Sequence, residues 1–240
     1  MSVQPSSGHP TNGEGRGLSQ PPRTWIIVIA GAFIALFVCL LVFGAIAEDV
    51  HNQEAIALDS ILTPLLHSWA NPTLDAVMNG LTDIGSTQVV LPLLVVAILL
   101  LLWRRHRVEA LFLLVAMVGS VVINETLKLI FQRPRPQLAW AQVQPEYSFP
   151  SGHSMNSLVF YAALALIIAA LWNRRVGLIL LVLAVVLAVL IGTSRIYLGY
   201  HYFTDVVGGF VAGAAWLIVV SAAFGVEIWE HRSREGASVT

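Results

Sequence analysis

The sequence predicts an all-α integral membrane protein: a six-helix bundle with short interfacial helices between the first and second spans. Hydrophobic residues make up 57% of its 240 residues and charged residues only 11%, whereas about 25% is usual for a soluble domain. Six stretches with few or no charges reach the roughly 20 residues that cross a bilayer. We expect helices there, because backbone groups in hydrocarbon must bond within the segment and no stretch shows the alternating polarity of a barrel strand.

The predicted spans follow one another along the chain and are separated by polar segments. Between the first two, Asn71-Pro72 favours a turn that divides residues 55–69 from residues 74–81. Both segments mix apolar and polar residues at helical spacing, so we expect amphipathic helices at the membrane surface, with a packed loop as the alternative. The predicted spans are residues 25–47, 84–103, 110–131, 154–172, 176–194 and 206–226.

Composition also defines the domains and excludes several classes of protein. Residues 1–23 are rich in Gly, Pro, Ser and Gln, which is typical of a disordered tail. We assign residues 24–228 to the six-span membrane domain and residues 229–240 to a second tail. A soluble cytosolic enzyme, a disordered chain and a nucleic-acid binder with a basic face are excluded. The single Cys39 forms no internal disulfide and no cysteine-based zinc site.

The basic residues are distributed unevenly between the two sides of the predicted membrane domain. An even number of spans places both termini on one side, and nine of the 13 Lys and Arg residues fall there. The positive-inside rule therefore places both termini in the cytoplasm. The remaining four oppose this bias, so we expect them to have another task. They lie at the ends of the third and fifth spans and are Lys128, Arg133, Arg135 and Arg195.

Three segments on the outer side carry residues suited to binding an anion. Lys128, Arg135 and Arg195 place three cations at one face of the membrane, and such cations bind phosphate oxygens. Ser151 and Gly152 lie just before the fourth predicted span, where unpaired N–H groups and the helix dipole favour an anion. Glycine at this point allows the main chain to approach an oxyanion closely.

Two histidines and an aspartate fall in the same region as these cations. Asp205 follows His201 by four residues, which places both on one face of a helix that starts there. A carboxylate beside an imidazole fixes its tautomer and supports its charged form. With His153 as a second imidazole, the set indicates phosphoryl transfer: one histidine attacks phosphorus and the other protonates the leaving oxygen. A metal site is disfavoured, because three adjacent cations oppose a divalent ion.

The three segments together resemble the signature of the type 2 phosphatidic acid phosphatase / vanadium haloperoxidase superfamily, and specifically its bacterial membrane lipid phosphatases. The family pattern is K-x6-R-P, then P-S-G-H, then S-R-x5-H-x3-D. The resemblance covers roughly residues 25–226, including the six-span organisation. The chain matches every position in order, as Lys128…Arg135-Pro136, Pro150-Ser151-Gly152-His153 and Ser194-Arg195…His201…Asp205.

The resemblance implies a role for each matched residue. His201 would be the nucleophile that forms a phosphohistidine, and Asp205 would orient it. His153 would protonate the leaving group. The family members of this kind need no metal or cofactor. The residues implied to bind the phosphoryl group are Lys128, Arg135, Arg195, Ser151, Gly152 and Ser194.

The resemblance also implies a substrate class and a location. Such enzymes hydrolyse lipid phosphomonoesters or diphosphates, including phosphatidic acid, phosphatidylglycerol phosphate and undecaprenyl diphosphate. We expect a multi-pass protein of the cell membrane with an extracytoplasmic site, whose partners are membrane lipids and a lipid phosphate, with no nucleic acid. The alternatives are an oxyanion site like that of a vanadium-dependent haloperoxidase and a non-catalytic lipid-phosphate transporter or scaffold.

Three features beside the motifs complete the expectations. Glu125 lies one turn before Lys128 and is expected to pair with it. Arg133 lies outside the motif positions, and contact with substrate, contact with a lipid headgroup and plain solvation all stay open. The aromatic residues of loop 132–149, which are expected to border the entrance to the site, are Trp140, Tyr147 and Phe149.

Overall fold

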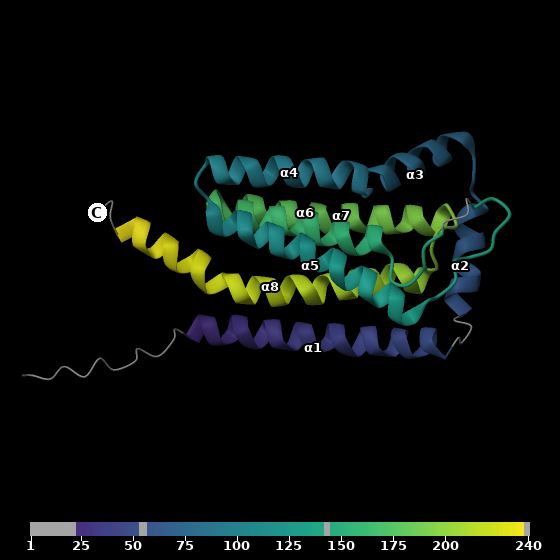
Figure 1. Cartoon of the computed structure of the whole chain (residues 1–240), viewed down its shortest axis with the longest axis horizontal. Coiled ribbons are helices and arrows are strands. Elements are labelled where there is room, and N and C mark those ends of the chain that lie inside the picture. Colours follow the sequence, from purple (N-terminus) through teal and green to yellow (C-terminus); the bar gives the residue numbers. More distant parts are fainter. Residues whose placement is uncertain (1–22, 53–56, 142–144, 238–240) are drawn as a thin grey trace, which may run out of the picture.

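The computed structural model describes residues 23–52, 57–141 and 145–237, and the regular structure in these ranges is helical throughout (Figure 1). The tail of residues 1–22 and residues 238–240 lie outside the described part, so most of the first predicted tail is not covered. The second predicted tail, from residue 229, continues the last helix up to Ala237. The helices are α1 Arg23–His51, α2 Ala57–His67, α3 Pro72–Ile84, α4 Thr87–Trp103, α5 Arg107–Phe131, α6 Gly152–Leu171, α7 Arg174–Tyr197 and α8 Phe203–Ala237.

The long helices run side by side and α2 lies across one end of the bundle (Figure 1). Helices α1, α5, α6, α7 and α8 each contain a stretch long and apolar enough to cross a membrane, and the bent pair α3–α4 supplies a sixth candidate span. The predicted all-α, six-helix membrane bundle is confirmed. The chain is a multi-pass membrane protein.

The second predicted span differs from its expectation. Residues 84–103 were expected to form one continuous helix, but α3 ends at Ile84, α4 begins at Thr87, and their axes differ by 41°. Helix α4 has 17 residues, which gives a length of about 26 Å and so falls short of the bilayer core. Gly85 is the C-cap of α3 and Ser86 the N-cap of α4, and glycine allows close packing at this point, because a Cβ on Gly85 would lie 2.5 Å from Cγ2 of Ile191 in α7.

The segment before this break is longer and better anchored than a surface helix of residues 74–81. Asn71 caps α3 by accepting a hydrogen bond from the Leu74 N–H at 3.0 Å, and Pro72 fits the first turn, where no donor is needed. The Tyr197 hydroxyl at the end of α7 donates to Asp75 at 2.6 Å. Helix α3 is therefore fixed against α7 at the same end of the bundle as α2.

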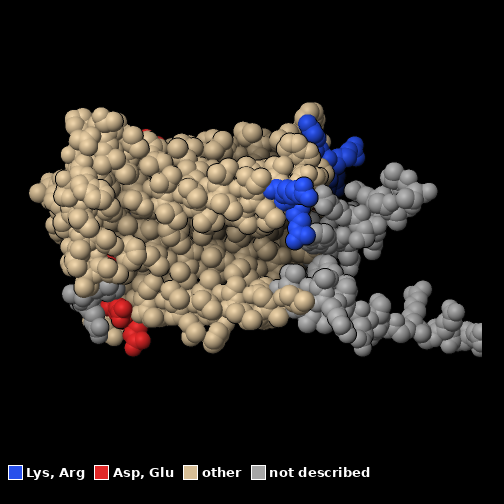
Figure 2. Space-filling view, turned by 180° about the vertical axis from the view of Figure 1, so that it is seen from behind, with Lys and Arg blue, Asp and Glu red and all other residues tan. Residues whose placement is uncertain are grey.

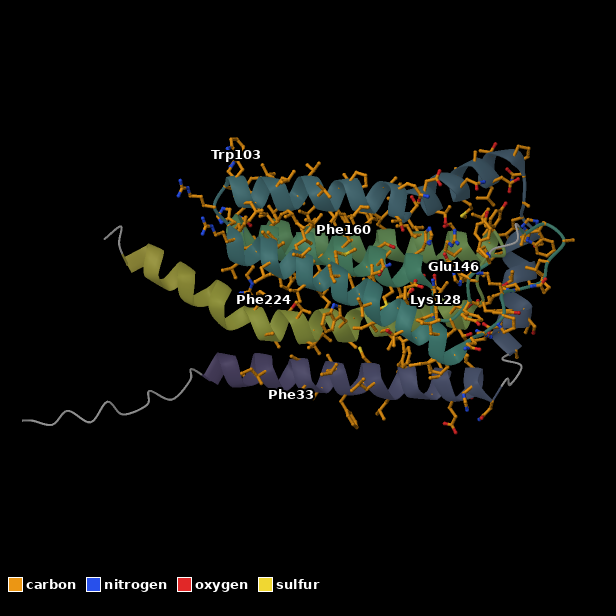
Figure 3. The ribbon with its side chains drawn as sticks, viewed as in Figure 1. Phe33, Trp103, Lys128, Glu146, Phe160 and Phe224 are labelled. Atoms are coloured by element: carbon orange, nitrogen blue, oxygen red, sulfur yellow. The ribbon has the colours of Figure 1, made fainter. Side chains whose placement is uncertain are left out.

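The centre of the bundle is built on α6, which packs against α5, α7 and α8. Phe160 of α6 and Leu113 of α5 are completely buried, whereas Phe33 of α1 is 68% exposed (Figure 3). Small residues allow close helix contact, since a Cβ on Gly177 would lie 2.2 Å from the Ala169 Cβ. The exposed apolar side chains form a surface that suits lipid rather than water.

The charged surface is divided between the two ends of the bundle. From behind, basic side chains gather at one end, acidic ones appear at the other, and the surface between is uncharged (Figure 2). Lys128, Arg135 and Arg195 lie at the end that shows no basic patch in this view, because each is buried. The exposed basic residues at the opposite end are Arg104, Arg105, Arg107, Arg174 and Arg175.

Candidate active site

The antiparallel course of the last four helices brings the three sequence motifs to one end of the bundle (Figure 1). Lys128 lies in the last turn of α5, and Gly152 begins α6. Arg195 lies in the last turn of α7, and Asp205 in the first turn of α8. Segments that are up to 77 residues apart in sequence therefore share a single site, on which α2 and the end of α3 also border.

His201 lies in the turn between α7 and α8 and is almost completely buried. Its Nδ1 is 3.4 Å from Oδ2 of Asp205, and its Nε2 is 3.2 Å from Nη1 of Arg135. A carboxylate on Nδ1 selects the tautomer in which Nδ1 carries the proton, so the lone pair of Nε2 points to the Arg135 cation. A group that binds Arg135 and replaces this contact would therefore lie next to Nε2.

Burial also changes the acid–base behaviour of His201. Loss of solvation disfavours the charged ring, and the neighbouring arginines act in the same direction, while Asp205 opposes them. The net effect lowers the pKa of His201 to about 4. The imidazole is therefore neutral at physiological pH, as a nitrogen nucleophile must be.

Asp205 is completely buried and is bonded from several elements. Besides His201, its Oδ2 accepts a hydrogen bond from the Tyr202 N–H at 2.9 Å and one from the Ser148 hydroxyl. Its Oδ1 accepts from Nη1 of Arg133 at 2.6 Å. Asp205 thus also bonds a backbone N–H at the start of α8, so helix capping and contact with His201 coexist in one side chain.

Two of the motif cations hold a carboxylate between them. Nζ of Lys128 lies 3.1 Å and Nη2 of Arg135 lies 3.7 Å from Oε2 of Glu146, which comes from the loop between α5 and α6. Figure 3 shows Lys128 and Glu146 near each other at this end of the bundle. Lys128 also contacts Glu125 at 2.9 Å, so the predicted Glu125 pair is confirmed. Glu146 shows that these two cations can hold one anion between them.

Charge and burial shift the pKa values of Glu146 and Arg135, which both lie in the loop between α5 and α6. The cation of Lys128 lowers the pKa of Glu146, because it stabilises the carboxylate. Burial lowers the pKa of Arg135, although Glu146 and Asp205 partly offset this effect. Arg135 remains a cation, with Nε donating to the Glu146 carbonyl and Nη1 to the Tyr200 carbonyl, both at 2.8 Å.

Arg195 is buried and only partly satisfied. Its Nη1 donates to the Thr82 hydroxyl at 2.9 Å, and its Cζ lies 4.2 Å from the centre of the Tyr200 ring. Its Nε has no hydrogen-bond partner among the described residues. A buried donor without a partner is costly, so this N–H suits an incoming oxyanion.

The start of α6 is positioned by its cap. The Ser151 hydroxyl accepts from the Ser154 N–H at 3.4 Å, and the Ser151 N–H donates to the Asp205 carbonyl at 2.9 Å. A Cβ on Gly152 would lie 3.0 Å from Asn124 Oδ1 and 3.9 Å from Nζ of Lys128, so glycine keeps this approach open. The ring of His153 is close enough to His201 for electrostatic interaction and makes no hydrogen bond to another described residue.

The contacts of two residues, Ser194 and Phe149, differ from those expected from the sequence. The Ser194 hydroxyl is buried and donates to the Ile191 carbonyl at 2.6 Å within its own helix, so it serves α7 locally. Phe149 was expected to border the entrance, but it is completely buried between Phe43 and Phe131, at ring distances of 5.7 and 5.1 Å. An aromatic residue beside a helix start packs into the bundle when hydrophobic partners surround it.

Several residues of the site were not singled out from the sequence. Glu146 and Ser148 lie in a loop with no fixed spacing to a motif, and Thr82 lies on α3, far from Arg195 in sequence. Arg133, left open above, contacts Asp205 directly. The one available signal was its position two residues before Arg135, on the side of the membrane where basic residues oppose the topology bias.

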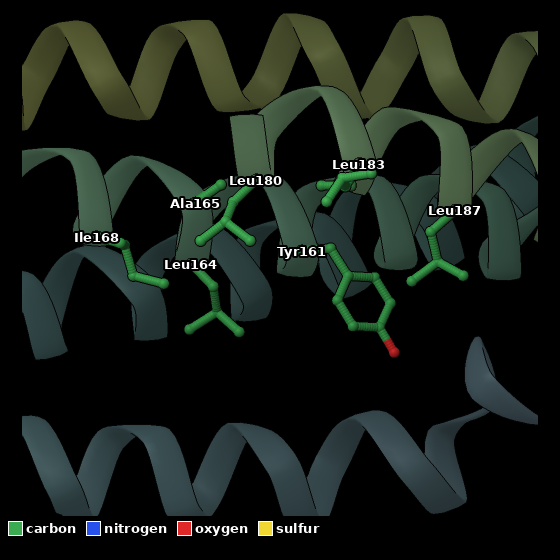
Figure 4. A pocket seen from close by; sticks show the side chains of 8 residues that line it. Tyr161, Leu164, Ala165, Ile168, Leu180, Leu183 and Leu187 are labelled. Atoms are coloured by element: carbon green, nitrogen blue, oxygen red, sulfur yellow. The ribbon is translucent and has the colours of Figure 1, made fainter. Parts of the chain in front are cut away.

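An apolar groove of about 270 Å³ lies between α6 and α7, facing α4 (Figure 4). Its lining is hydrophobic except for the Tyr161 hydroxyl, which donates to the Ile84 carbonyl at 2.9 Å. The groove contains no motif residue, so it is separate from the candidate active site. Its lining residues are Tyr161, Leu164, Ala165, Ile168, Leu180, Leu183, Ala184 and Leu187.

The membrane fold and this cluster of cations and histidines define an integral membrane enzyme that hydrolyses phosphate esters of lipids. Comparison with known proteins agrees. The model of the PAP2 superfamily matches residues 109–229, which contain all three motifs. The chain belongs to the PAP2 superfamily.

Two relatives and one solved structure make the similarity more specific. The chain is 32% identical to phosphatidylglycerophosphatase B of Bacillus subtilis (strain 168), over 75% of this chain and 88% of that protein. It is 25% identical to an undecaprenyl-diphosphatase of Sulfolobus acidocaldarius, over 82% of this chain and 88% of that protein. A crystal structure of a transmembrane PAP2-type phosphatidylglycerolphosphate phosphatase from Bacillus subtilis superposes with a TM-score of 0.73 at 30% identity, covering 78% of this chain and 94% of that one.

Proposed function

We propose that this chain hydrolyses phosphatidylglycerol phosphate at the extracytoplasmic face of the cell membrane, through a phosphohistidine formed on His201. One observation carries the chemistry: Asp205 holds Nδ1 of His201 while Nε2 faces the Arg135 cation at 3.2 Å. This pairs a neutral nucleophile with a phosphate-binding group in a buried site. The activity is assigned to the domain of residues 24–228.

The first step transfers the phosphoryl group to the enzyme. Nε2 of His201 forms a bond to phosphorus while the bond from phosphorus to the leaving oxygen breaks. The cationic form of His153, which the charge of the bound phosphoryl group stabilises, donates its proton to that oxygen, so the lipid leaves as an alcohol and His153 becomes neutral. The positive charge that develops on the His201 ring is stabilised by Asp205 through Nδ1.

The second step releases phosphate. The neutral His153 now accepts a proton from water, whose oxygen attacks phosphorus as the bond to Nε2 breaks. The oxygens around phosphorus are neutralised in both steps by fixed cations, which require no rearrangement once substrate is bound. The groups assigned to this task are Lys128, Arg135, Arg195 and the N–H of Gly152 at the start of α6, since the Ser151 N–H already donates to the Asp205 carbonyl.

Binding of substrate requires a change of partner for two of these cations. Glu146 is paired with Lys128 and Arg135. Its side chain is 62% exposed, so it can leave the pair for water. The phosphoryl group therefore replaces one anion by another at the same cations, and the unpartnered Nε of Arg195 supplies an additional donor.

The orientation in the membrane rests on the exposed arginines. The five exposed arginines named above lie at the end of the bundle opposite the site, where Figure 2 shows a basic patch. The positive-inside rule assigns such an end to the cytoplasm. The test uses a Cys39→Ala background with one new cysteine at each end, Ser68→Cys or Arg175→Cys. A membrane-impermeant thiol reagent applied to intact cells should label only the Ser68→Cys variant, and labelling of the other variant alone would reverse the orientation.

Phosphatidylglycerol phosphate is supported by the relative and the solved structure named for it, which match over 75% and 78% of this chain. Undecaprenyl diphosphate is the second candidate, because other relatives are named for it, one at 25% identity over 82% of this chain and two at 33% and 34% identity over 60% and 52% of it. The test compares kcat/KM on both lipids and on phosphatidic acid, with purified protein in the same detergent. A higher value on undecaprenyl diphosphate would replace the first candidate, and no phosphate release from any of the three would reject the function.

A further inference from the structure

A line of buried charges continues behind Asp205, on the side away from His201. Nη1 of Arg133 donates to Oδ1 of Asp205 at 2.6 Å, and Nη2 donates to Oδ2 of Asp59 at 2.7 Å. Arg133 follows the end of α5, while Asp59 lies in the first turn of α2. The side chain of Arg133 is 14% exposed and that of Asp59 is 6% exposed. One guanidinium thus joins two carboxylates from separate helices.

Neighbouring groups fix this line of charges at both ends. Asp59 accepts hydrogen bonds from the Thr204 N–H at 2.9 Å and from the Thr204 hydroxyl at 2.6 Å. Arg133 also donates to that hydroxyl at 2.8 Å, and its Cζ lies 4.2 Å from the centre of the Tyr202 ring. The Arg133 carbonyl accepts from the N–H of Ser148, whose own hydroxyl donates to Asp205. Helix α2 and the loop after α5 are therefore tied to the start of α8.

We propose that Asp59 and Arg133 are positioning residues of the catalytic centre, which hold Asp205 in place and set the negative charge that it presents to His201. This inference rests on the proposed function of His201. Neither residue occupies a specified position of the three motifs, and Asp59 precedes Arg133 by 74 residues. The α2 helix is then part of the catalytic unit rather than a covering of its outer end.

Charge balance gives each of the two residues a distinct effect. Asp59, Arg133 and Asp205 together carry one net negative charge, directed at the His201 ring through Asp205. Without Asp59, the cation of Arg133 neutralises Asp205 alone, and the positive charge on a phosphorylated ring loses support. Without Arg133, the charges of Asp205 and of Asp59 behind it are no longer offset by a cation, and protonation of His201 becomes easier.

Other charged groups also face His201 and stay unchanged in these variants. Arg135 and Glu146 approach from the loop between α5 and α6, and Arg195 approaches from α7. His153 approaches from α6, and Asp205 itself from α8. A difference between variants in the protonation of His201 therefore reports the contribution of Asp59 and Arg133.

The test measures kcat/KM from pH 3 to pH 8 for the full-length protein and three variants on one lipid phosphate. Since protonation of Nε2 removes the nucleophile, His201 controls the acid limb of the profile. Arg133→Gln should raise the midpoint of this limb by about one pH unit, and Asp59→Asn should lower it. The double variant restores one net negative charge, so its midpoint should return toward that of the wild type.

Two more variants separate charge from folding. Arg133→Lys keeps the charge but not the fork that reaches both carboxylates, so kcat should fall about tenfold while the midpoint stays in place. Asp75→Asn removes a carboxylate that also accepts a short hydrogen bond at this end, from Tyr197, and should leave the midpoint unchanged. An equal loss of activity in every variant at each pH, with no shift of the midpoint, would overturn the proposal.

The proposed function and this inference fail differently. If the wild type releases no phosphate from any lipid, or if His201→Ala still forms a covalent phosphoenzyme, the function is wrong. If the wild type is active but Arg133→Gln and Asp59→Asn move the acid limb in the same direction, or not at all, only the role of Asp59 and Arg133 is wrong.

Discussion

Basic residues occur at both ends of the bundle, but the two groups differ in burial and in their partners. Arg104, Arg107 and Arg174 are exposed at one end, as Figure 2 shows for the basic patch there. At the other end Lys128 and Arg195 are 6% and 5% exposed. The ammonium group of Lys128 pairs with the carboxylates of Glu125 and Glu146. An exposed arginine is stabilised by water, whereas a buried cation requires an anion. The buried group is therefore the one suited to bind a phosphate.

The strongest test of this difference replaces one histidine at each end by alanine, in separate variants. His201→Ala removes the proposed nucleophile and should lower kcat at least about 10³-fold, because no neighbouring group replaces Nε2. Phosphate release and covalent labelling by a radioactive lipid phosphate measure the two consequences separately. His106→Ala, at the start of α5 and far from the site, serves as the matched control and should keep both. Retained labelling in the His201 variant would contradict the assignment.

The arginines provide a second and smaller contrast. Arg195→Gln removes a buried cation and the unpartnered Nε, so kcat/KM should fall on the order of 10²-fold. Arg174→Gln removes an exposed cation from the first turn of α7 and should leave kcat/KM unchanged. Both substitutions lie on the same helix, so a general weakening of α7 would affect both. Equal losses in the two variants would mean that burial does not distinguish the two groups.

The third contrast concerns pH. The low pKa of His201, about 4, keeps Nε2 unprotonated at neutral pH, and activity should be lost as the pH falls through this value. A solvated histidine would be protonated, and so unable to attack, as the pH falls through about 6.5. The midpoint of the acid limb of kcat/KM, measured with a return to pH 7 to exclude irreversible unfolding, separates the two cases. An acid limb near pH 6.5 would show that the ring is less desolvated than its burial implies.

The sequence could predict the features that depend on local signals, but not those that depend on contacts between distant segments. Spans and motif positions follow from local signals, since hydropathy identifies a span and fixed spacing identifies Lys128 with Arg135, or His201 with Asp205. The break was missed because the hydropathy of residues 84–103 outweighed the local signal of Gly85 as a C-cap and Ser86 as an N-cap. The close approach of Gly85 to Ile191 on another helix is not contained in any pattern within one segment.

The missing parts of the site have the same origin. Glu146 reaches Lys128 from a loop whose path depends on the packing of Phe149 against Phe43 and Phe131. Asp59 meets Arg133 only because α2 crosses the end of the bundle (Figure 1). Contacts of this kind are formed by tertiary packing between distant segments, so neither periodicity nor charge counting along the chain could locate them.

The smallest expected effect concerns Glu146, the carboxylate that pairs with two cations of the buried end. Glu146→Gln removes the carboxylate that competes with substrate for Lys128 and Arg135, so KM for the lipid phosphate and the inhibition constant of vanadate should both fall, by about two- to fivefold. The effect is modest because Glu146 is largely exposed and its ion pairs are screened. Raising the salt concentration should therefore reduce the difference between the variant and the wild type.

Glu125→Gln is the matched control for this last experiment. Glu125 also pairs with Lys128, at 2.9 Å, but the structure gives it no contact with Arg135. If the competition takes place at the phosphate position shared by both cations, Glu125→Gln should change KM less than Glu146→Gln does. Equal changes would show that Lys128 alone is responsible, and an increase in KM in the Glu146 variant would mean that this carboxylate organises the site for substrate instead of occupying it.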